Sequence, residues 1–220
     1  RVDMDLLAFA KGPALQVAAY IFVAGSIWRI VGIVLLKEKV DYSEPRKSAG
    51  LLAALKVIYT RSFTASPFKK ATLYPKMLAY VQHIGLFAVI FLFVPHIVFF
   101  KGFLGFDWPG LPNNIIYLFG VAAVVASIAL LVRRLTSPVL KLISNFDDYF
   151  SWFVTVLPLV TGLMIPVRMG LRYEDILAIH VLSVVLLMIW FPFGKLGHAF
   201  LVFVTRGTTG MVFERRGAKT

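Results

Sequence analysis

The sequence contains no cysteine among its 220 residues. This absence excludes disulfides, iron–sulfur ligation, thiolate-bound haem, covalently attached c-type haem and a cysteine nucleophile within the chain. Acidic residues are also scarce, because 11 Asp and Glu stand against 23 Lys and Arg and leave a formal net charge of +12. Any redox centre in this chain must therefore use ligands other than thiolates.

Apolar residues make up most of what is present. Of the whole chain, 59% is hydrophobic and only 15% is charged, and the mean hydropathy is +0.82. This balance is typical of a membrane protein. Basic residues in loops between apolar runs report orientation and contact with anionic headgroups, so we expect a lipid bilayer and no nucleic acid as partner. We expect the run from Pro13 to be a retained span rather than a signal peptide.

Five apolar segments are long enough to cross a hydrocarbon core of about 30 Å, which needs roughly 20 helical residues. The runs lack the two-residue alternation of barrel strands. The sequence therefore predicts an all-α integral membrane bundle of five transmembrane helices, in one domain over 1–220. The predicted spans are Pro13–Leu36, Met77–Phe100, Ile115–Val132, Phe146–Pro166 and Ile176–Phe203.

The distribution of positive charge predicts the orientation of this bundle. Segments 37–76, 133–145 and 204–220 together carry 16 Lys and Arg, whereas 1–12, 101–114 and 167–175 carry 5. Cytoplasmic loops are enriched in these residues. We therefore expect a multi-pass protein of the cell inner (cytoplasmic) membrane, with its N-terminus outside and its C-terminus in the cytoplasm.

The longest predicted connection, 37–76, contains an apolar stretch from Leu51 to Tyr59 that is followed by Arg61, Lys69 and Lys70. We interpret this stretch as an amphipathic helix at the cytoplasmic face of the membrane. A solvated basic loop and a docking surface for a soluble partner remain as alternatives.

All four histidines lie in the second and fifth predicted spans, His83 and His96 in one and His180 and His198 in the other. Ionisable side chains within a membrane are costly, so this clustering favours a function. The two spans run in opposite directions, which sets His83 level with His198 toward the cytoplasm and His96 level with His180 toward the outside. Paired neutral imidazoles across an apolar bundle suit b-type haem, so we expect two haem b; zinc would need three or four ligands at one level.

The spacing of the histidines is less regular. On one continuous helix, the 18 residues from His180 to His198 make five turns and set both on one face about 27 Å apart. The 13 residues from His83 to His96 rotate the side chains by about 140° on an ideal helix, and Pro95 could kink that helix. Histidines satisfied by backbone carbonyls or hydroxyls, and a cofactor-free histidine relay in a proton or ion transporter, are the competing interpretations.

Several short motifs support one family. The most specific are Phe191-Pro192-Phe193 and Lys195-Leu196-Gly197-His198, and the others are Gln82-His83-Ile84-Gly85, Arg133-Arg134-Leu135 with Ser137-Pro138, and Gly162-Leu163 with Ile165-Pro166. Over nearly all five spans, the chain resembles the gamma subunit family of respiratory nitrate reductase, which are membrane dihaem cytochromes b. It is similar also to related subunits of sulfur-metabolising and heterodisulfide-reductase-like complexes.

By this resemblance, His83 and His198 would ligate the iron of an inner haem b, and His96 and His180 that of an outer one. The family implies a membrane-anchor subunit of a respiratory oxidoreductase. Such a subunit transfers electrons between a quinone/quinol pool and cytoplasmic or membrane-associated iron–sulfur or catalytic subunits. The lysine that nitrate reductase uses at its quinol site has no clear counterpart here, so the quinone contacts stay open, as does whether this chain carries the quinone site.

Other polar residues in or beside the spans have more than one interpretation. Arg29 either neutralises a propionate of the inner haem or extends to the inner headgroups. Asp147 and Asp148 open the fourth span, where carboxylates favour a helix N-terminus, although a proton-transfer role is the alternative. Trp108 and Trp152 are expected as interfacial anchors.

Overall fold

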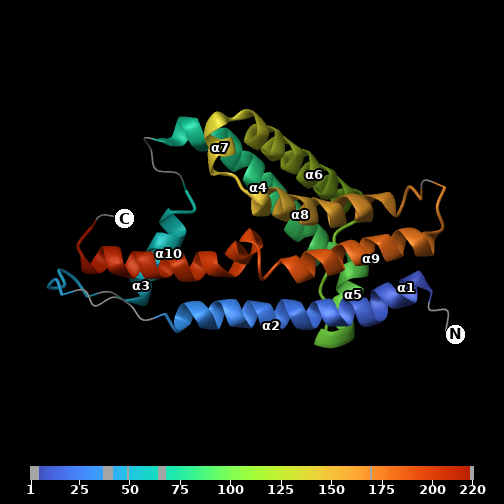
Figure 1. The fold of residues 1–220 in the computed structure, drawn as a ribbon, viewed down its shortest axis with the longest axis horizontal. Helices are drawn as coiled ribbons and strands as arrows, with labels where there is room; N and C mark the ends of the chain where they lie inside the picture. The colour runs from blue at the N-terminus through green and yellow to red at the C-terminus, as the bar shows by residue number, and fades with distance from the viewer. Residues whose placement is uncertain (1–4, 37–41, 49, 64–67, 169, 219–220) are drawn as a thin grey trace. The chain divides into compact units, whose positions relative to one another are not determined.

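The computed structural model describes residues 5–36, 42–48, 50–63, 68–168, 170–218, and within these ranges every regular element is a helix (Figure 1). The elements are α1 (Leu6–Phe9), the π-helix η1 (Ala10–Ala14), α2 (Leu15–Val34), α3 (Leu51–Thr60), α4 (Lys69–Leu92), α5 (Val94–Leu104), α6 (Asn113–Thr136), α7 (Pro138–Ile143), α8 (Phe146–Met164), α9 (Tyr173–Trp190), the 3-10 turn η3 (Lys195–Gly197) and α10 (His198–Arg215). The predicted all-α class is confirmed for this part of the chain.

The chain divides into two compact units. Unit 1 contains Arg1–Ile21 and Tyr74–Trp190, and unit 2 contains Phe22–Leu73 and Phe191–Thr220. The division falls inside both α2 and α4, so each of these helices contributes residues to both units. Three of the four histidines belong to unit 1 and His198 belongs to unit 2. The single domain expected from the sequence stays a prediction.

Four helical stretches are long and apolar enough to cross a membrane, namely Leu6–Val34, Lys69–Leu92, Asn113–Thr136 and Tyr173–Trp190. The first combines α1, η1 and α2 and begins earlier than the predicted Pro13. The helix α8 covers most of the fourth predicted span, 146–166, but it opens on two aspartates and buries three Ser and Thr side chains. It is not among these four stretches. The chain is a helical protein of the multi-pass membrane type.

In unit 1, α8 packs against both α6 and α9 (Figure 1). Trp152, expected as an interfacial anchor, ties α8 to α6, because its indole N–H donates to the carbonyl oxygen of Ser127 at 2.8 Å. Asp148 completes a capping box with Asn145 at the start of α8. Its Oδ1 also lies 3.1 Å from Nη1 of Arg134. The helix-capping interpretation is therefore confirmed for Asp148.

The second predicted span, 77–100, is not one helix. It is divided between α4 and α5, and Phe93 between them has an extended backbone with φ −82° and ψ 122°. In a continuous helix, the ring of Pro95 would clash with the carbonyl group of Phe91; in the first turn of α5 it is tolerated. The prediction of one continuous helix is wrong here, whereas the distortion attributed to Pro95 is confirmed.

The fifth predicted span, 176–203, is also interrupted. The helix α9 ends at Trp190, a turn follows, and α10 begins only at His198. Pro192 lies in this turn, where it has no N–H to donate to a helix and its side chain is fully buried. The prediction that His180 and His198 share one helix face about 27 Å apart requires a continuous helix and is wrong.

In unit 2, the predicted helical stretch 51–59 forms α3, which packs against α10. A Cβ atom at Gly210 would lie 2.6 Å from the carbonyl oxygen of Ala53, so only glycine allows this approach of the two backbones. On its other face, α3 exposes Leu51, Leu52 and Leu55. The helix is confirmed, and its position at a membrane surface stays a prediction.

Candidate functional site

The structure brings His96 on α5 and His180 on α9 together within unit 1. Their ring centroids are 6.2 Å apart, and the ring planes are within 7° of parallel. These are the two histidines that the predicted topology sets at the same level of the membrane. The helix break at Phe93 decides how His96 enters this pair, because α5 is a separate helix from α4.

The same break supplies the hydrogen-bond acceptor that orients His96. The last four carbonyl groups of a helix have no partner within it, and in α4 these belong to residues 89–92. Three of them accept from elsewhere: Val89 from Nδ1 of His96 at 2.8 Å, Phe91 from the indole of Trp108, and Leu92 from the backbone N–H of Leu111 at 2.8 Å. A carbonyl group at the end of α4 that would otherwise lack a hydrogen-bond donor therefore holds the His96 imidazole ring in place.

Two neighbouring residues of α8 shape the surroundings of His180. The Thr161 hydroxyl donates to the carbonyl oxygen of Leu157 at 2.9 Å and lies 3.1 Å from Nδ1 of His180, from which it can accept. A Cβ atom at Gly162 would lie 3.2 Å from Cε1 of the same ring. Thr161 thus orients the imidazole, and Gly162 leaves space for it.

A second hydroxyl completes this arrangement. Ser183 is buried, donates to the carbonyl oxygen of His180 at 2.6 Å and lies 3.0 Å from the Thr161 hydroxyl. Neither Thr161 nor Ser183 was predicted as a functional residue from the sequence. A signal was present, because isolated hydroxyl residues in apolar helices commonly hydrogen-bond between helices.

All four histidines use Nδ1 for a hydrogen bond to an oxygen atom. His83 contacts the carbonyl oxygen of Ala79 at 2.7 Å, and His198 contacts that of Lys195 at 2.8 Å. A carbonyl oxygen only accepts, so Nδ1 must carry the proton in His83, His96 and His198. In a neutral imidazole, Nε2 then keeps the lone pair, which is the tautomer that binds a metal.

The predicted inner pair is divided between the two units. His83 is half-buried on α4 in unit 1, whereas His198 is exposed at the first residue of α10 in unit 2. Their pairing therefore stays a prediction. In each of these two residues, a nearby backbone carbonyl group orients the imidazole ring.

No cluster of three or more His, Asp or Glu side chains that could hold a metal ion occurs among the residues described. Zinc takes three or four protein ligands, so the described histidines do not match a zinc site. A b-type haem takes two axial histidines, and a pair is sufficient for it.

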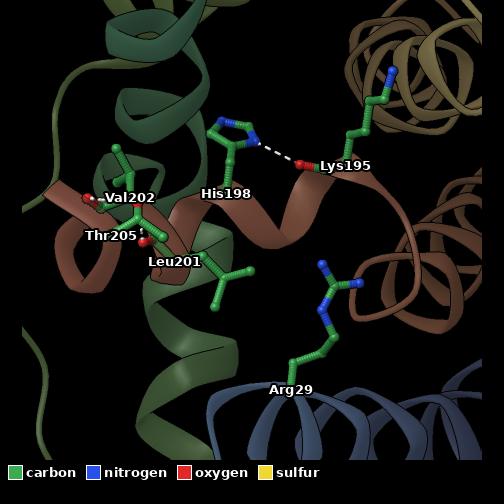
Figure 2. Close-up of a pocket in the computed structure, with 6 residues that line it drawn as sticks. All are labelled: Arg29, Lys195, His198, Leu201, Val202 and Thr205. Atoms are coloured by element: carbon green, nitrogen blue, oxygen red, sulfur yellow. Dashed lines mark hydrogen bonds between the residues drawn. The ribbon is translucent and has the colours of Figure 1, made fainter. Parts of the chain in front are cut away.

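In unit 2, Arg29 and His198 line an open hollow of about 480 Å³ with Lys195, Leu201, Val202 and Thr205 (Figure 2). Nη1 of Arg29 donates to the carbonyl oxygen of Pro192 at 3.0 Å and to that of Phe193 at 3.3 Å. The partners predicted for this arginine from the sequence are a haem propionate or lipid headgroups. In the structure, the partners of Arg29 are backbone carbonyl groups of the turn that follows α9.

The comparisons with known proteins show a relative that is similar over almost the whole chain. A protein of Nitratidesulfovibrio vulgaris (strain Hildenborough), which carries no functional name, is 28% identical over an alignment of 227 residues that covers 98% of this chain and 97% of the relative. No family model and no solved structure matches the chain. The chain is therefore similar to this relative over nearly all of both sequences, and the similarity assigns no function.

Proposed function

We propose that this chain is a membrane-anchor dihaem cytochrome b of a respiratory oxidoreductase. It forms a five-helix bundle in the inner membrane, with α8 as the fifth spanning helix and the N-terminus outside. The chain passes electrons between a quinone/quinol pool and a hydrophilic partner subunit. The observation that carries the proposal is the parallel pair of His96 and His180 imidazoles, each with Nδ1 bonded to an oxygen.

The spacing of this pair suits an iron ion between the two rings. Metal–imidazole bonds are about 2 Å long, and with each nitrogen about 1 Å from its ring centre, two opposed rings lie roughly 6 Å apart. The centroids of His96 and His180 are 6.2 Å apart. A haem held by two histidines supplies one-electron chemistry with no open coordination position, which suits electron transfer rather than substrate binding.

The role of the protein is to hold the ligands and exclude water. The Val89 carbonyl group keeps His96 in the ligating tautomer, and the Thr161 hydroxyl, which donates to Leu157, can accept from Nδ1 of His180 and favour the same tautomer there. Apolar helices around the site exclude water, which is one of the means by which a protein sets the potential of a haem. The proposal also assigns His83 and His198 to the inner haem, on the predicted topology and the family resemblance. The quinone and the iron–sulfur or catalytic partner rest on the family resemblance.

The first experiment is a reduced-minus-oxidised spectrum of the purified full chain, with haem quantified per polypeptide. We expect the spectrum of a b-type cytochrome and about two haems per chain. A folded preparation that was expressed with a supply of haem and contains none would overturn the proposal in favour of a histidine-relay transporter. One haem per chain would contradict the dihaem assignment.

The variant Thr161→Val tests the orientation of His180. It keeps the shape of the side chain and removes the hydroxyl that lies 3.1 Å from Nδ1. Loss of such an outer partner typically lowers metal affinity by about 10–100-fold, so we expect a loss of that order for the outer haem in a haem titration. The inner haem should bind as before.

Thr155→Val is the matched control for this variant. Thr155 is also buried on α8, and its hydroxyl donates to the carbonyl oxygen of Ser151 at 2.7 Å rather than to a histidine. It should leave both haem affinities unchanged. If the two variants weaken the outer haem equally, Thr161 acts through the stability of α8 and the proposed contact has no special role.

A further inference from the structure

One face of α2 contacts the segment that joins α9 to α10, and all the residues concerned belong to unit 2. Phe22, Gly25 and Arg29 are three and four positions apart, a spacing that sets side chains on the same face of a helix. Each of the three makes a different kind of contact with the segment 191–194. We call these three residues the α2 clasp.

The first two contacts of the α2 clasp are apolar. The ring of Phe22 lies 5.2 Å from that of Phe191, edge to face. A Cβ atom at Gly25 would lie 2.7 Å from both Cβ and Cγ of Pro192, which is closer than real Cβ atoms approach. Because the Pro192 side chain is fully buried, it has little room to move away. Gly25 is therefore required for the segment to lie against α2.

The third contact is polar. The segment has left α9, and carbonyl groups outside a helix need other donors. The Arg29 guanidinium supplies them to Pro192 at 3.0 Å and to Phe193 at 3.3 Å. A charged donor makes a stronger hydrogen bond than a neutral one, and the planar guanidinium presents its N–H groups in a fixed arrangement. Figure 2 shows the Arg29 side chain extending from α2 toward this loop.

The segment leads directly to His198. After Gly194 the chain forms η3, and the carbonyl oxygen of Lys195 in this turn accepts the Nδ1 proton of His198 at 2.8 Å (Figure 2). A Cβ atom at Gly197 would lie 3.6 Å from Nη2 of Arg29, so the guanidinium also borders the last residue of η3. The direction of the His198 imidazole thus depends on where the α2 clasp holds the turn.

We propose that Arg29 is a positioning residue for His198, acting through the backbone of residues 192–193 together with Gly25. The inference rests on the proposed function, in which His198 is a haem ligand. It assigns to Arg29 a structural hydrogen-bonding role, in which its charge serves the turn and not a haem propionate. Gly25→Ala distinguishes the two roles, because it removes no charge. It should weaken the inner haem if Arg29 positions the turn, and it should have no effect on this haem if Arg29 neutralises a propionate.

The test compares Arg29→Gln, Arg29→Lys and Gly25→Ala in the full chain. We expect Arg29→Gln and Gly25→Ala each to speed amide hydrogen exchange in residues 191–200 about tenfold or more in the haem-free chain. In the haem-loaded chain, each should lower the affinity for the inner haem by about 10–100-fold or change its low-spin EPR signal, and leave the outer haem unchanged. Arg29→Lys should restore at most part of either readout, because an ammonium group is more strongly hydrated than a guanidinium and is carried on a flexible four-carbon stem.

Lys195→Gln is the control for charge. It removes a cation that lines the same hollow and keeps the backbone carbonyl group that accepts from His198. It should leave both the exchange rates and the shape of the EPR signal unchanged.

Two results would overturn the positioning role. In the first, Arg29→Gln and Lys195→Gln both lower the reduction potential of the inner haem and leave its EPR signal unaltered. Arg29→Lys then restores the potential, and Gly25→Ala has no effect on it. In the second, exchange speeds up while the inner haem is unchanged. Absence of haem from the wild-type chain is a separate result, which refutes the proposed function, whereas the exchange rates still report whether the α2 clasp holds the turn.

Discussion

Replacing His180 by alanine is expected to remove the outer haem and leave the inner one, so that the purified variant keeps about half of the wild-type haem. The reason is that the His180 ring is the partner of His96 in the pair whose centroids are 6.2 Å apart. Iron held by two imidazoles loses one of its two protein ligands in this variant. Haem per polypeptide and the reduced-minus-oxidised spectrum measure the loss.

The complementary variant, His198→Ala, is expected to remove only the inner haem. Each variant is the control for the other, because the haem that remains shows that the chain has folded. His96→Ala should reproduce the spectrum of His180→Ala, and His83→Ala that of His198→Ala. The four variants together therefore test the pairing residue by residue.

Loss of both haems, or of neither, from folded His180→Ala protein would refute the proposed ligands. A spectrum of His96→Ala that matches that of His198→Ala would refute the pairing while keeping the histidines as ligands. Added imidazole offers a further check, since a small ligand can enter the space left by the removed ring. Supplied together with haem, it should restore the outer spectrum in His180→Ala, and it should have no effect on the wild-type chain.

The pairing of His96 with His180 shows what the sequence can predict. Long apolar runs predict the helices, and charge in the loops predicts alternating directions, so the approach of these two residues follows from topology alone. Neither prediction needs an exact helix boundary. The pair consequently survives the error made at Phe93, where the continuous second span proves to be two helices.

The continuity of the second and fifth predicted helices was predicted wrongly from the sequence. Proline within an apolar run can kink a helix, end it or start a new one, and tertiary contacts decide among these outcomes. At Pro95 the freed carbonyl groups find Trp108 and Leu111 as donors. In the turn after α9, the carbonyl groups of Pro192 and Phe193 accept from Arg29, which is more than 160 positions away in the chain. Such remote donors are invisible to local patterns.

The residues that orient the histidines were missed for a related reason. Thr161 in an apolar helix is a general signal for a contact between helices, but only the packing of α8 on α9 shows that the contact is His180. Gly25 carries even less information, since a helical glycine has many uses. Its requirement becomes visible when the Pro192 ring is found against it.

Gly85→Val is expected to destabilise unit 1 strongly. On α4, a Cβ atom at this position would lie 2.6 Å from the carbonyl oxygen of Phe119 and 2.9 Å from Cβ of Ala123, both on α6. The first of these is backbone, which cannot rotate away as a flexible side chain can. Overpacking of this kind costs about 1–3 kcal/mol, and we expect the upper part of that range.

The measurement is the midpoint of thermal unfolding in detergent, where 1 kcal/mol corresponds to about 2–4 °C for a chain of this size. Gly102→Val is the matched control, because Gly102 lies in α5 and a Cβ atom there would have no neighbour within 4 Å. It should shift the midpoint little, since valine is no worse than glycine in a helix. Equal shifts in the two variants would mean that α4 and α6 separate easily at Gly85. A larger shift for Gly85→Val would show that the close approach of α4 to α6 at Gly85 contributes to the stability of unit 1.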